Sequence, residues 1–138
     1  MSPTFLDRAI TNEAAIDSFL LNVATIRESV ESMGVRFLHV LQPTPVTKSK
    51  LWLCEKYGLE TIETLYPGLR KALVESYQKI REKIAQGRGA PDNFLDLSRA
   101  TDGLDAYLYS DYVHEHRNGH LTRLIGESIA RRAAPLMN

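Results

Sequence analysis

The sequence predicts an α/β fold with a parallel sheet, on the basis of three observations. Apolar residues recur at the three-and-four spacing of a helix over about 12–33, 66–86 and 118–133. Two short apolar segments, 35–41 and 93–98, lie between these stretches and have the composition of buried strands. Helices that alternate with strands place successive strands parallel in one sheet, joined by right-handed crossovers.

The first helix is expected to run from about Asn12 to Met33. Asn12 is a good N-cap residue, and Gly34 can take the left-handed conformation that ends a helix. The expected buried stripe of this helix consists of Ile16, Phe19, Leu20, Val23, Ile26, Val30 and Met33. The segment 35–41 is expected to form a largely buried strand that stops at Gln42, before a proline.

The middle of the chain begins with a loop over 43–50 that is rich in Pro, Thr, Ser and Lys. A short helical piece through Trp52 is expected to end at Gly58. The second long helix is expected to open near Tyr66, with Pro67 in its first turn, where the missing N–H costs nothing. Its expected buried stripe consists of Leu69, Leu73, Tyr77, Ile80 and Ile84.

The last third of the chain holds the second strand candidate, 93–98, and then a turn at Gly103. The final helix is expected from about Asn118 to Ala133. Its inward residues are Leu121, Leu124, Ile125 and Ile129. Two strands are few for a parallel sheet that helices cover, since such sheets usually have about five strands. Either the helices pack on each other, or another chain or a missing N-terminal segment completes the sheet.

Length and composition describe one globular domain over residues 1–138. Apolar residues make up 43% of the chain and charged residues 25%, and 17 basic side chains balance 17 acidic ones. A net charge of zero argues against a nucleic-acid partner and against a polybasic membrane-surface protein. No stretch has the length of a membrane span and no signal peptide is visible, so a soluble, cytoplasmic protein is the default expectation.

Asp111 and His114 form the most pointed candidate site, on a segment that leads into the last helix. An Asp three residues before a His can bind one imidazole nitrogen, fix the tautomer and leave the other nitrogen as a general base. On spacing alone, an exposed His at a helix entry explains the pair better. Tyr109 and Tyr112 are candidate substrate-binding residues beside His114, although tyrosines serve equally as half-buried packing.

With its context, this segment resembles the closing block of the SGNH (GDSL-type) hydrolases. In that family an Asp-x-x-His pair is followed by a Gly-Asn or Gly-His step, here at Gly119, and by a last helix rich in Ile and Ala, here 124–130. The strand that ends at Gln42 is similar to the family's fourth strand, and 93–98 to its fifth. The resemblance covers nearly all of this chain but only the second half of a typical family member.

The resemblance implies a flavodoxin-like three-layer α/β/α fold and a serine nucleophile that hydrolyses or transfers acyl esters, including those on lipids and carbohydrates. His114 would be the general base of such an enzyme and Asp111 its orienting partner. Gln42, at the end of the first strand, is a third candidate for substrate binding. The resemblance implies no metal or organic cofactor.

The sequence departs from the family in one serious respect. The Gly-Asp-Ser nucleophile block and the family's two oxyanion blocks do not occur in these residues. The Gly126-Glu127-Ser128 step is only superficially similar, because it lies within the expected last helix, and Ser128 is interpreted as structural. An acyl-transfer site needs a nucleophile and oxyanion donors as well as a base. This chain alone is therefore not expected to be an efficient esterase.

Three explanations stay open. The chain is the C-terminal part of a longer hydrolase, or a short relative that lost its nucleophile and serves as an interaction or scaffolding module, or it uses another serine in a rearranged site. The small sheet favours the first explanation, since further strands would complete it. The second explanation would use the unpaired sheet edge to bind a partner.

Metal binding is the competing hypothesis for the same segment. Potential ligands gather there: Asp111, His114, Glu115, His116 and His120. However, an Asn-Gly step interrupts the helix, and no Cys pair or His-Glu-x-x-His pattern supports zinc. Solvated histidines near a turn are the favoured interpretation.

Two further residues are expected to be structural. His39, in the first strand, is expected to be a core histidine rather than a metal ligand. Cys54 has no base nearby in the sequence and no second cysteine to pair with, so it is expected to be a partly buried, inert thiol.

Overall fold

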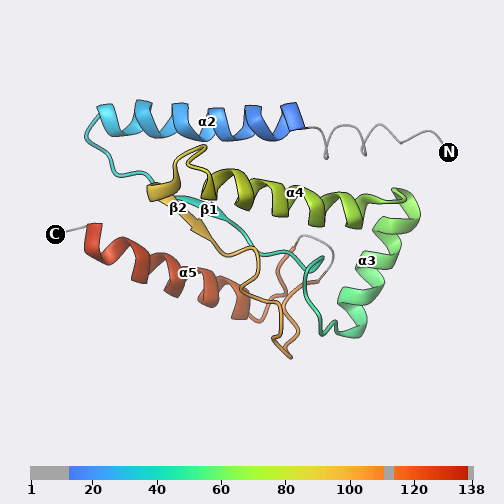
Figure 1. Cartoon of the computed structure of the whole chain (residues 1–138). Helices are drawn as coiled ribbons and strands as arrows, with labels where there is room; N and C mark the ends of the chain where they lie inside the picture. The colour runs from blue at the N-terminus through green and yellow to red at the C-terminus, as the bar shows by residue number, and fades with distance from the viewer. Residues whose placement is uncertain (1–12, 111–113, 137–138) are drawn as a thin grey trace.

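The computed structural model describes residues 13–110 and 114–136 and has an α/β fold. Its elements are α2 (Glu13–Ser32), β1 (His39–Leu41), α3 (Leu53–Leu65), α4 (Leu69–Ala85), β2 (Phe94–Asp96) and α5 (His120–Ala133), with short 3-10 turns at Pro91–Asn93 and Ala134–Leu136. In Figure 1, α2 and α4 lie above the two strands and α5 lies below them. The predicted alternation of helices and strands is confirmed at this level.

The sheet of the described residues consists of β1 and β2, which run parallel as predicted. His39 pairs with Phe94 and Leu41 with Asp96. Both strands are shorter than the segments 35–41 and 93–98, and side chains explain why. The side-chain amide of Asn93 donates to the Phe37 carbonyl at 3.0 Å. The Asp96 carboxylate accepts from the backbone amide of Ser98 at 2.9 Å. These local bonds replace the ladder at both ends of the pairing.

The buried stripe of α2 is shorter than the sequence predicted. Ile16, Leu20 and Val23 are buried, whereas Ile26 and Met33 are 51% and 70% exposed. Only the first half of α2 lies against α4, where Lys83 contacts the carboxylates of both Glu13 and Asp17 at 2.9 Å. The second half of α2 extends past this contact, where Ile26 is exposed and Val30 is half-buried.

The prediction that the short helix ends at Gly58 is wrong, because α3 continues to Leu65. A mid-helix glycine costs about 1 kcal/mol, and the burial of Leu59 and Ile62 beyond it offsets that cost. The next helix begins at Leu69 rather than near Tyr66. Gly68, with φ +89°, makes the turn between the two helices, which Leu or Ala would make only with strain.

The residues that α4 buries also differ from the predicted stripe. Leu69, Ala72 and Ser76 are the buried residues of this helix, and Leu73, Tyr77, Ile80 and Ile84 are half-buried. The side of the helix that faces the core is therefore the one that carries Leu69, Ala72 and Ser76, and the rest of the predicted stripe lies at its margin.

His39, expected to be a core histidine, is half-buried and packs among aromatic rings. Its ring stacks on Phe94 at 5.0 Å between centroids and meets Phe19 edge-on at 5.5 Å. Burial holds the pKa of the His39 imidazole below its ordinary value, because water no longer solvates the charged form. His39 therefore packs as a neutral aromatic side chain.

No helix among the described residues is both long and apolar enough to cross a membrane.

Replacing Gly126 with Ala is expected to stabilise the protein by about 0.5–1 kcal/mol. Gly126 lies in the exposed middle of α5, and an added methyl group meets nothing within 4 Å. Gly119→Ala is the matched control, since Gly119 has φ +70° and the same methyl group there costs roughly 1–2 kcal/mol. Urea denaturation followed by circular dichroism measures both. Destabilisation by Gly126→Ala would contradict the placement of 126–128 inside an ordinary helix.

Candidate functional site

The loops that follow the two strands meet beyond the carboxyl ends of the sheet. One loop runs over 42–52 and leads into α3, and the other runs over 97–119 and leads into α5 (Figure 1). Open parallel sheets place their ligand sites at this end of the strands. His114 lies in the described part of the second loop, and Asp111 falls outside the described residues.

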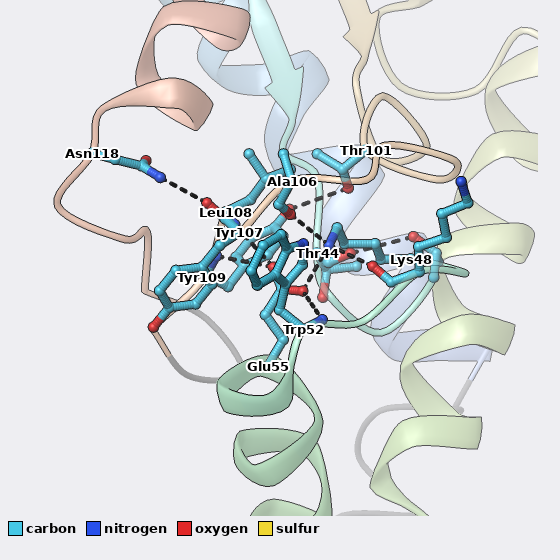
Figure 2. Close-up of polar contacts among 12 residues, drawn as sticks. Thr44, Lys48, Trp52, Glu55, Thr101, Ala106, Tyr107, Leu108, Tyr109 and Asn118 are labelled. Carbon is cyan, nitrogen blue, oxygen red and sulfur yellow. Dashed lines mark hydrogen bonds and ion pairs between the residues drawn. The ribbon is translucent and has the colours of Figure 1, made fainter.

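A fully buried ion pair joins these loops. The Lys48 ammonium lies 2.6 Å from Glu55 Oε2, and both side chains have no exposed surface. Lys48 also donates to the Lys50 carbonyl at 2.6 Å and to the Ala106 carbonyl at 2.8 Å, as Figure 2 shows in part. All three ammonium protons therefore have acceptors. One of those acceptors lies in the second loop.

The Glu55 carboxylate binds the second loop directly. Its Oε1 accepts hydrogen bonds from the Leu108 amide at 3.0 Å and the Tyr109 amide at 3.2 Å. Its Oε2 accepts from the Trp52 amide at 2.9 Å, which caps the first turn of α3. Burial acts to raise the pKa of the Glu55 carboxyl, but the hydrogen bonds from Lys48 and the amides outweigh it. The pKa of Glu55 therefore lies below its ordinary value.

The segment that carries His114 is a narrow turn whose two arms are paired. Tyr109 and Glu115 form an isolated antiparallel bridge. The Ser110 amide donates to the His114 carbonyl at 2.9 Å, and the His116 amide donates to the Leu108 carbonyl at 2.8 Å. Glu55 binds the first arm through the Leu108 and Tyr109 amides, and the bonds between the two arms link that arm to the backbone of His114.

The predicted site residues have different placements. His114 is exposed on the second arm of this turn, and Gln42 is exposed directly after β1. Tyr109 is 1% exposed, and its hydroxyl lies 3.4 Å from that of Thr101. Asp111 and Tyr112 lie outside the described residues, so the pairing of Asp111 with His114 stays a prediction.

Tyr109 occupies a core position. Its burial raises the pKa of the phenol to about 12, so the hydroxyl is neutral at physiological pH. Together with Leu108 and Leu121 it forms the small apolar cluster that attaches α5 to the loop. This placement corresponds to the packing role that the sequence analysis weighed beside substrate binding.

Three rings form a row at the surface beside the buried ion pair. Trp52, which is 49% exposed, stacks on Tyr107 at 6.3 Å between centroids, and Tyr107 meets His116 at 4.0 Å. His116 Nδ1 is buried and has no hydrogen-bond partner among the described residues.

Cys54 is exposed in the first turn of α3, so the prediction of a partly buried thiol is wrong. It is the second residue of a helix whose buried face starts at the next residue, Glu55.

Glu115 has a structural function at the start of α5. Its carboxylate accepts the Thr122 amide at 2.7 Å and also the Thr122 hydroxyl. These hydrogen bonds, from the Thr122 hydroxyl first, hold the pKa of Glu115 below its ordinary value. No group of three or more His, Cys, Asp or Glu side chains in the described ranges, which omit Asp111, is arranged to hold a metal ion.

Ser128 lies inside α5, and its hydroxyl donates to the Leu124 carbonyl at 2.7 Å. This intrahelical bond is typical of a structural serine and agrees with the interpretation made from the sequence.

Sequence reasoning missed Lys48 and Glu55 as site residues. Lys48 lies between Thr47 and Ser49 and Glu55 directly before Lys56, and composition alone assigns charged side chains to the surface. The one available signal was the position of Glu55 in the first turn of a helix, where a carboxylate can cap exposed amides.

The ion pair also predicts a pH dependence. A carboxyl whose pKa is lowered on folding contributes stability that is fully present above its unfolded pKa, about 4.5, and is lost as the pH falls through the folded value. We expect the melting temperature of the native protein to exceed that of Glu55→Gln at pH 7 and the difference to shrink below pH 4.5. Differential scanning calorimetry at both pH values measures it. A difference that stays constant into acid would contradict a charged Glu55.

No protein-family model, no curated protein and no solved structure matches this chain.

Proposed function

We propose that the chain supplies the acid–base part of an SGNH-type serine esterase. In this proposal β1 and β2 belong to a larger flavodoxin-like sheet that helices cover on both faces. The observation that carries it is the placement of His114. It lies exposed on a loop that follows the carboxyl end of a parallel strand, and a buried ion pair fixes that loop to the fold.

In the proposed mechanism, the His114 imidazole takes the proton from a serine hydroxyl as the serine attacks an ester carbonyl. Asp111 orients the imidazole and stabilises its charged form. His114 then gives the proton to the leaving alcohol, and a water molecule repeats the two steps to release the acid. The serine and the oxyanion donors come from residues outside this sequence. The substrate is an acyl ester of a small molecule, a carbohydrate or a lipid.

A fluorophosphonate probe tests the proposal, because it forms a covalent adduct only with an activated serine. The experiment uses the 138-residue chain and a longer protein that includes the coding region upstream of Met1. We expect an adduct on the longer protein, on the serine of a Gly-Asp-Ser block, and its loss in His114→Ala. Intact-mass and fragment-mass spectrometry identify the labelled residue.

Two outcomes would overturn parts of this proposal. An adduct on the 138-residue chain that His114→Ala abolishes would place the nucleophile within these residues. An upstream region without a Gly-Asp-Ser block, together with no adduct, would remove the esterase and favour a non-catalytic function.

The second candidate is an interaction module, and the surface of α3 supports it. Leu53, Tyr57 and Leu65 are 81%, 71% and 64% exposed on this helix. A cavity of about 420 Å³ lies between α3 and the start of α4 and is lined in part by Leu51 and Leu59. A contiguous apolar patch marks a protein contact, and in this candidate the exposed side chains of α3 contribute to one. Size-exclusion chromatography with light scattering tests self-association, and a strictly monomeric chain counts against the form of this candidate in which copies pair.

A further inference from the structure

The buried Lys48–Glu55 pair is placed to do more than fill the core. A buried ion pair is a costly way to stabilise a fold, since an apolar pair of similar volume is often as good. Such pairs are retained where they define one arrangement of the chain. Here the pair contacts three separate segments of the chain: the loop after β1, the first turn of α3 and the arm that leads toward His114.

We propose that Lys48 and Glu55 are positioning residues that set the location of His114. The contacts run from the carboxylate to the Leu108 and Tyr109 amides, and from there through the pairing of the turn to the backbone of His114. The Lys48 bond to the Ala106 carbonyl fixes the same arm two residues earlier. Neither charged group touches solvent, so neither one is a catalytic residue.

Among the described residues the arm has other attachments as well, since Leu108 and Tyr109 are buried against Leu121 and Tyr107 stacks on Trp52. Asn118 binds the Tyr107 carbonyl at 2.8 Å, but its side chain is exposed. Tyr109 is held by burial and by its contact with Thr101 (Figure 2). The two carboxylate bonds are the only hydrogen bonds found for the Leu108 and Tyr109 amides among the described residues. In Glu55→Gln the uncharged side chain keeps only one acceptor oxygen for the Lys48 ammonium and the Trp52, Leu108 and Tyr109 amides, so the attachment of the arm is weakened.

The catalytic meaning of this inference rests on the proposed function, whereas the anchoring itself can be tested without activity. Residue-resolved amide hydrogen exchange is measured on the native chain, Glu55→Gln and Glu63→Gln. Glu63 is a matched control, because its carboxylate also accepts two backbone amides, those of Gly68 at 2.7 Å and Arg70 at 3.1 Å, at a distant turn.

In Glu55→Gln we expect exchange at the Leu108, Tyr109 and His116 amides to accelerate at least tenfold more than exchange in α2 and α4. The His114 ring signals in the NMR spectrum are expected to shift in this variant and not in Glu63→Gln. Equal acceleration throughout the protein, or none at the turn, would overturn the proposal. The first outcome would reduce the pair to a general stabiliser of the fold.

Lys48→Met provides a second variant should Glu55→Gln not fold. It keeps the carboxylate with its three amide donors and removes the links to Lys50 and Ala106. A smaller acceleration confined to the turn is expected, because the Ala106 link is lost while the Leu108 and Tyr109 amides keep their acceptor, and its absence overturns the proposal. In an active longer protein, Glu55→Gln is expected to lower kcat at least tenfold with little change in KM. If fluorophosphonate labelling fails while the exchange result holds, the esterase is excluded and the anchoring remains.

Discussion

Glu55→Ala is expected to lower the free energy of unfolding by about 3–5 kcal/mol, the usual cost of removing one partner from a buried ion pair. The change leaves the Lys48 ammonium without its counter-ion in a site that has no exposed surface. It also removes the acceptor of the Trp52, Leu108 and Tyr109 amides. Since domains of this size have about 5–15 kcal/mol of stability, the variant is expected to be near the limit of folding.

Urea denaturation followed by circular dichroism measures this loss. Glu75→Ala is the control, because Glu75 pairs with Lys71 at 3.7 Å on an exposed helix face, where such a pair contributes less than about 1 kcal/mol. A loss below about 1 kcal/mol in Glu55→Ala would contradict a buried, charged Glu55. Lys48→Met and Glu55→Met, made singly and together, form a double-mutant cycle. The double variant is expected to recover part of the loss, since no unpaired charge remains.

The sequence predicted which helices and strands form better than it predicted where they begin and end. Periodicity identified α2, α4 and α5, and the alternation with strands predicted the parallel pairing of β1 and β2. The end of α3 was misplaced because the local effect of Gly58 was given more weight than the burial of Leu59 and Ile62. That burial depends on packing against α4, which no local pattern reports.

The candidate site, like the fold, could be predicted from the sequence only in part. The spacing of Asp111 and His114 predicted a site on the loop before α5, and this pairing stays a prediction because Asp111 lies outside the described residues. The residues that anchor the loop could not be found in this way, because Glu55 and Tyr109 are 54 positions apart in the sequence. Tyr109 was predicted as a candidate substrate-binding residue because its burial could not be read from the local sequence either. Its polar end resembles a binding residue in sequence, while its environment in the fold is the core.

His114→Ala is expected to have the largest effect on activity in a protein that carries the serine. Without the imidazole no group accepts the serine proton, and we expect kcat/KM to fall by roughly 10⁴-fold or more. Asp111→Asn is expected to cost about 10⁴-fold, since an amide in place of the carboxylate favours the wrong tautomer of the imidazole. Steady-state hydrolysis of a chromogenic acyl ester measures both variants.

His120→Ala separates this role from a general need for histidines on the loop. His120 is exposed at the first position of α5, six residues after His114. Its loss is expected to change kcat/KM by less than about tenfold, because His120 has no part in the proposed proton transfer. A surface substitution of this kind also alters the free energy of unfolding by only about 0.5 kcal/mol, so the fold is retained. Equal losses in His120→Ala and His114→Ala would instead indicate that the histidines act as a cluster. A double variant of Asp111 and His114 that loses no more activity than His114→Ala would show that the two side chains act as one unit.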